Sequence, residues 1–101
     1  MIGPLDEDSL ANASREEIHG SLFEALVSQQ MNMALMFLGE VTHPETGDKY
    51  RDPESAKMYI DQLEMLQAKT RGNLTPAEEK ILHDCLKLVR RAFTHVLNAG
   101  N

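Results

Sequence analysis

The sequence has no tryptophan, one cysteine and few aromatic residues, and each shortage excludes something. Because a disulfide needs two cysteines, Cys85 cannot form one within the chain, and a single cysteine cannot build a cysteine-based zinc site. Three phenylalanines and two tyrosines leave a core made mainly of aliphatic residues and methionine. The longest uninterrupted apolar run, residues 33–38, is far shorter than the roughly 20 residues that span a membrane. We therefore expect no membrane partner.

Positive charge is also scarce: ten lysines and arginines stand against sixteen aspartates and glutamates, for a net charge of −6. Nucleic-acid backbones attract concentrated positive charge, so we expect nucleic acid not to be a partner. The opening residues lack a basic stretch followed by an apolar one, so we expect no secretory signal. A free thiol suits a reducing compartment, and together these features predict a cytoplasmic protein.

Three stretches have apolar residues at helical spacing and are flanked by residues that start helices. We expect helices at about residues 15–38, 53–71 and 76–97. Ser14 has the spacing of a capping box with the acid three residues later. Asp52-Pro53 and Thr75-Pro76 each combine a capping residue with a proline suited to the first helical turn.

The predicted fold is an all-α, three-helix antiparallel bundle. The second and third helices form a hairpin because the link between them is short, and the long first helix packs across it. Residues 1–13 are acidic and lack helical periodicity, so they predict a disordered tail. Residues 14–101 then form a single helical domain.

The apolar stripe of the first helix includes Leu22 and Leu26, which we expect in the core, and Gln30 lies near its centre. A buried amide must be hydrogen-bonded or it destabilises the fold. Gln30 therefore either sets the register of helix packing or lies in a hydrated gap at the edge of the bundle.

The first two helices carry more apolar surface than three helices can cover. The end of the first helix is apolar on nearly every side. The second helix carries two methionines, Met58 and Met65, that are seven residues apart and lie away from its core stripe. The candidate interface residues are Met31, Leu35, Met36, Met58 and Met65. We expect this surface to meet a second copy of the chain or another protein, although scattered surface methionines and leucines are ordinary.

Catalytic and metal-binding patterns are weak. His83 and Cys85 are about 200° apart on a helix, so we do not expect them to share a metal ion. We find no serine, histidine and acid set that resembles a catalytic triad, and no glycine-rich phosphate loop. We expect no catalytic residue, no metal and no cofactor. The outer face of the third helix carries Lys87, Arg90 and Arg91. These cations either bind an anionic partner or interact favourably with the negative end of the helix dipole.

The sequence resembles a bacterial family of short helical proteins, known as domain of unknown function eighteen-forty-four, and Ala34 with Leu38-Gly39 resembles the end of that family's first helix. The matching residues are Pro44, Thr46 and Gly47, then Asp52, Ala56, Lys57, Ile60, Asp61, Leu63 and Leu66, then Lys69, Thr70, Gly72, Asn73, Leu74, Thr75, Glu78 and Glu79. The resemblance covers about residues 20–90 and implies a small cytoplasmic helical protein with no established activity. It implies no catalytic residue.

Five polar positions match the family motif: Lys57, Asp61, Lys69, Thr70 and Asn73. Their role is either to stabilise the helix ends and the turn or to bind a ligand. The sequence thus predicts a non-catalytic, homo-oligomeric interaction or regulatory module. The alternative is a small-molecule or metal-binding domain that uses the loop 40–51 together with the turn 69–75.

Overall fold

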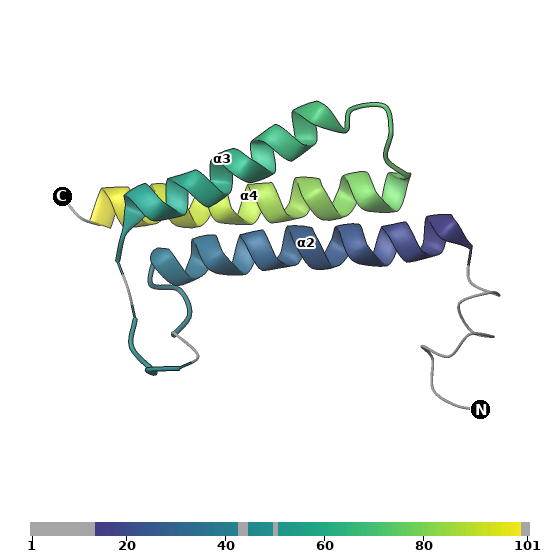
Figure 1. Cartoon of the computed structure of the whole chain (residues 1–101). Coiled ribbons are helices and arrows are strands. Elements are labelled where there is room, and N and C mark those ends of the chain that lie inside the picture. The colour runs from purple at the N-terminus through teal and green to yellow at the C-terminus, as the bar shows by residue number, and fades with distance from the viewer. Residues whose placement is uncertain (1–13, 43–44, 50, 100–101) are drawn as a thin grey trace.

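The computed structural model describes residues 14–42, 45–49 and 51–99, which form three helices and, over these ranges, no strand. The helices are α2 (Arg15–Phe37), α3 (Pro53–Lys69) and α4 (Pro76–Ala99). The expected all-α fold is confirmed, with α3 and α4 as an antiparallel hairpin and α2 alongside it (Figure 1). The predicted acidic tail at 1–13 lies outside the described residues.

Side-chain caps determine where the helices begin, as predicted. The hydroxyl of Ser14 accepts a hydrogen bond from the Glu17 N–H at 3.0 Å. A carboxylate oxygen of Asp52 accepts from the Ser55 N–H at 3.2 Å. The hydrogen bonds from Ser55, its side chain first and its backbone second, lower the pKa of Asp52.

The capping box of α4 is reciprocal: the Thr75 hydroxyl accepts from the Glu78 N–H at 3.2 Å, and the Glu78 carboxylate accepts from the Thr75 N–H at 2.9 Å. The predicted helix ends are less accurate than the starts, by one or two residues. Gly39 and Gly72 follow α2 and α3 with φ of 77° and 82°, a conformation that glycine adopts without strain.

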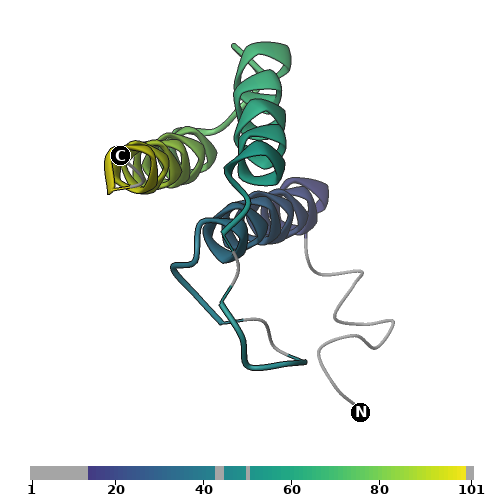
Figure 2. The ribbon, with the colours of Figure 1, turned by 90° about the vertical axis from the view of Figure 1, so that its left-hand side faces the viewer.

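The core lies where the three helices meet. Its fully buried side chains are Val27, Leu63, Leu82, Leu86 and Val89. A smaller cluster joins Leu38, Ala56 and Val96. Viewed along the bundle, the helices occupy the corners of a triangle (Figure 2). No described helix combines the length and hydropathy needed to cross a membrane.

The helix α3 separates the two connections. The chain passes from α2 to α3 at one end of the bundle and from α3 to α4 at the other (Figure 1). The 17 residues of α3 span about 25 Å at 1.5 Å per residue. Toward the second connection, α3 diverges from the other helices (Figure 1).

The burial of Leu63 leads to a stability prediction. Leu63 is 0% exposed, so Leu63→Ala removes contacts on every side and should lower the free energy of unfolding by about 2–5 kcal/mol. Urea denaturation followed by circular dichroism measures the loss. Leu88→Ala is the matched control: Leu88 is 47% exposed, and its truncation should cost under about 1 kcal/mol. Equal losses would contradict the assigned core.

Candidate interaction site

Two methionines form the clearest exposed apolar feature of α3. Met58 and Met65 are 50% and 47% exposed and lie two helical turns apart. They belong to an open groove of about 400 Å³. The residues that line it are Glu54, Lys57, Met58, Asp61, Gln62 and Met65. The lining of the groove thus combines apolar methionine side chains with charged groups of both signs.

The helix α2 carries two further exposed apolar side chains and is joined to α3 by a polar contact. Gln62 lies between the two methionines in sequence, and its Oε1 accepts a hydrogen bond from Gln30 Nε2 of α2 at 2.6 Å. Leu26 lies one helical turn before Gln30 and is 42% exposed, and Leu22, a further turn away, is 62% exposed. We call Leu22, Leu26, Met58 and Met65 the α2–α3 face.

The exposure of Leu22 and Leu26 corrects their expected place in the core. At 100° per residue, Leu26 lies about 100° and Leu22 about 140° from the fully buried Val27, so both side chains are turned away from the buried side of α2. The hydrogen bond between Gln30 and Gln62 favours the first of the two interpretations of Gln30, a residue that fixes how α2 and α3 pack.

The remaining predicted interface residues lie elsewhere. Met31 and Leu35 are half-buried against the main core. Met36 is only 8% exposed, so the expectation that three helices leave it uncovered is wrong. Leu38, at the same end of α2, is also buried, and the Asp52 N–H donates to the Phe37 carbonyl at 2.7 Å, which joins the start of α3 to this end of α2.

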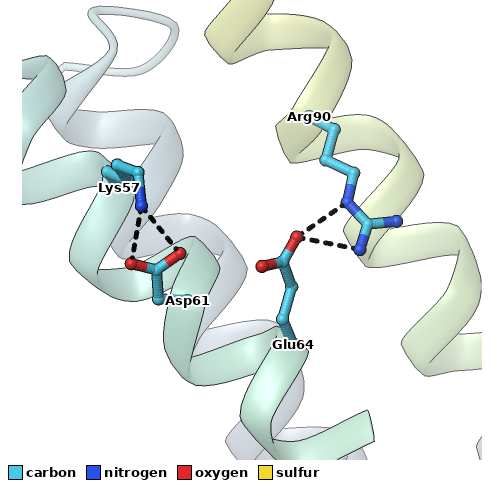
Figure 3. A network of polar contacts seen from close by, with 4 residues as sticks. All are labelled: Lys57, Asp61, Glu64 and Arg90. Carbon is cyan, nitrogen blue, oxygen red and sulfur yellow. Dashed lines mark hydrogen bonds and ion pairs between the residues drawn. The ribbon is translucent and has the colours of Figure 1, made fainter. Parts of the chain in front are cut away.

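Two ion pairs border the groove and the neighbouring helix. Lys57 Nζ lies 2.9 Å from Asp61 Oδ2 within α3, and Arg90 of α4 lies 2.9 Å from Glu64 Oε2 (Figure 3). The hydrogen bond with Asp61, and then its charge, raise the pKa of Lys57. Because Arg90 is paired with an acid, the basic face of α4 is a weaker attractor of anions than its sequence suggests.

The five motif positions fall into two groups that the structure does not bring together. Lys57 and Asp61 pair in the middle of α3. At its end, the Thr70 hydroxyl donates to the Leu66 carbonyl at 2.6 Å, and the Asn73 N–H donates to the Thr70 carbonyl at 2.9 Å. Lys69 lies in the last turn of α3, where a cation complements the helix dipole.

A second cavity, of about 670 Å³, lies where α3 and α4 diverge. Its lining residues are Gln67, Thr70, Arg71, Gly72, Leu74, Pro76, Glu79, Lys80, Leu82 and His83. The described residues of loop 40–51 and turn 69–75 lie at opposite ends of α3, so they do not form the expected shared pocket (Figure 1). Within the described ranges, no three His, Cys, Asp or Glu side chains are grouped to hold a metal ion.

The profile of one protein family, described as Domain of unknown function (DUF1844), matches residues 21–95. The match therefore includes all of α3, the turn after it and most of α2 and α4. Neither the curated proteins nor the solved structures contain a match.

Cys85 gives a chemical prediction. Desolvation raises the pKa of its thiol, with the charge of Asp84 adding to the effect, and the residue is 9% exposed. A raised pKa lowers the thiolate fraction at pH 8, and only the thiolate reacts. A chromogenic disulfide reagent should therefore react with the folded protein at least tenfold more slowly than with the protein unfolded in urea. Equal rates would show that Cys85 is accessible and reactive.

Proposed function

The chain belongs to the family described as Domain of unknown function (DUF1844), and on that premise we propose that it is a non-catalytic interaction module that self-associates through the α2–α3 face. The observation that carries this proposal is the pair of half-exposed methionines at the groove of α3. Clustered exposed apolar side chains are typical of interaction surfaces, because burying them is favourable.

The charges around the groove favour a second copy of the chain as the partner. Lys57 and Asp61 place one charge of each sign at its edge, 2.9 Å apart. A strongly acidic or basic partner would meet repulsion from one of them, whereas a surface of the same mixed charge can match it. Methionine side chains are unbranched and flexible, so they adapt to a facing surface.

The non-catalytic part of the proposal rests on how the polar groups are used. Asp52, Thr70 and Thr75 stabilise helix ends, and the ion pairs of Lys57 and Arg90 join groups on the helix surfaces. The raised pKa of Cys85 suits a core residue better than a nucleophile. The same free thiol supports a cytoplasmic location.

A charged residue in the α2–α3 face should prevent self-association. We expect the unmodified protein to be a dimer or larger at tens of micromolar, and Met58→Glu/Met65→Glu to be a monomer, because an interface would bury unpaired carboxylates. Light scattering after size exclusion, from about 1 to 200 µM, measures the mass. Circular dichroism checks that the helices remain.

Leu88→Glu/Leu97→Glu is the matched control, since these leucines are 47% and 45% exposed but lie on α4. This variant should keep the mass of the unmodified protein. A monomeric unmodified protein at 200 µM would reject self-association. Loss of association in both variants would reject the α2–α3 face as its location.

The cavity at the α3–α4 turn favours a second candidate function, the binding of a small anionic molecule. Its volume of about 670 Å³ is in the range of ligand pockets. Arg71 and His83 supply cationic or hydrogen-bonding groups beside the apolar side chains of Leu74 and Leu82. This combination suits a carboxylate attached to an apolar group.

Benzoate is a simple probe of that cavity, with benzyl alcohol as its uncharged control. If the cavity binds such anions, millimolar benzoate should shift the amide resonances of residues 70–83 in an NMR titration, and benzyl alcohol should shift them less. Arg71→Ala should weaken the response to benzoate. Absence of any shift with benzoate would remove this candidate.

A further inference from the structure

The outward face of α3 has the same pattern when it is read in either direction. Its residues are Glu54, Met58, Asp61, Gln62, Met65 and Lys69, and all but Lys69 line the groove of about 400 Å³. At 100° per residue, these six positions fall within about 100° of the helix circumference. They are arranged symmetrically about a point between Asp61 and Gln62: a methionine follows on each side, and then a charged residue.

The two charged ends of this pattern have opposite signs. Glu54 lies in the first turn of α3 and Lys69 in the last. A partner helix that runs in the opposite direction places an acid against a base at both ends. A partner that runs in the same direction places glutamate against glutamate and lysine against lysine, which is unfavourable.

We propose that two copies of the chain pair through α3, antiparallel, around a two-fold axis that passes between Asp61 and Gln62. In this register Met58 packs on the partner's Met65, and Glu54 faces the partner's Lys69. The inference rests on the self-association proposed above and specifies its geometry. A two-fold interface requires a surface that is complementary to itself, and the symmetric pattern of α3 meets that requirement.

The polar residues at the axis fit the same arrangement. Gln62 Oε1 already accepts from Gln30, so the Gln62 amide nitrogen is directed to donate elsewhere, and the partner's Asp61 lies opposite it. The two Asp61 carboxylates approach each other at the axis. Each has Lys57 of its own chain 2.9 Å away, which offsets their repulsion.

The charge of the face also identifies the partner. The face carries Glu54 and Asp61 against Lys69, and Lys57 beside it pairs with Asp61, so these four groups together have no net charge and offer little attraction to a uniformly acidic or basic protein. A second copy supplies both methionines and both opposite charges at the required positions.

Disulfide cross-linking tests the register. In a Cys85→Ala background, whose folding is checked by circular dichroism, Met58→Cys and Met65→Cys chains are oxidised separately and as an equal mixture. In the antiparallel register, residue 58 of one chain and residue 58 of its partner are separated by seven residues along the helix axis, about 10 Å. This distance is too long for a disulfide. The mixture should therefore give at least tenfold more covalent dimer than either chain alone. Asp61→Cys, next to the axis, should cross-link by itself.

Charge reversal is the second arm. Glu54→Lys alone should raise the dimer dissociation constant about threefold or more, because two pairs become repulsive. Glu54→Lys/Lys69→Glu should restore it, since the charges are exchanged but remain complementary.

The outcomes separate the two proposals. A monomeric unmodified protein overturns both. If the protein is a dimer and Met58→Glu/Met65→Glu disrupts it, but Met58→Cys cross-links by itself as well as the mixture does, self-association stands and the antiparallel register is wrong. A dimer that the double charge exchange does not restore also contradicts this register.

Discussion

Leu63 is fully buried between α2 and α4, and it fixes which side of α3 faces the core. Positions two residues apart on a helix point about 200° from each other, so fixing Leu63 inward turns Met65 outward. Met58 is directed outward by the same constraint. The buried contact that holds the three helices together is thus also what exposes the methionines. The groove on α3 follows directly from the packing of the core.

The sequence was sufficient for the parts of the fold that local chemistry decides. Ser14, Asp52 and Thr75 accept hydrogen bonds within a few residues, so their roles as caps are readable from spacing alone. The resemblance to the family, carried by residues such as Lys69 and Asn73, is confirmed over residues 21–95. Periodicity also separated Met58 and Met65 from the core stripe of α3, and both are exposed.

The sequence-based predictions that were wrong concern features that arise only when the helices pack together. Leu22 and Leu26 lie in the predicted apolar stripe of α2, but the buried side of the helix is centred near Val27 and both leucines are exposed. Met36 is directed away from the core stripe, yet it is only 8% exposed. Likewise, the described residues of loop 40–51 are separated from turn 69–75 by the full length of α3. The hydrogen-bond partner of Gln30 is Gln62, which lies 32 residues away, so spacing along the sequence does not reveal it.

The half-exposed methionines give the α2–α3 face a sensitivity that a face of leucines would lack. Oxidants convert an accessible thioether to a sulfoxide, which is polar and chiral. At Met58 or Met65, this change would put a strong hydrogen-bond acceptor into the apolar centre of the groove without altering the buried contacts of Leu63. The helical fold would remain while the surface lost its apolar character, and reductase repair of the sulfoxide would restore it.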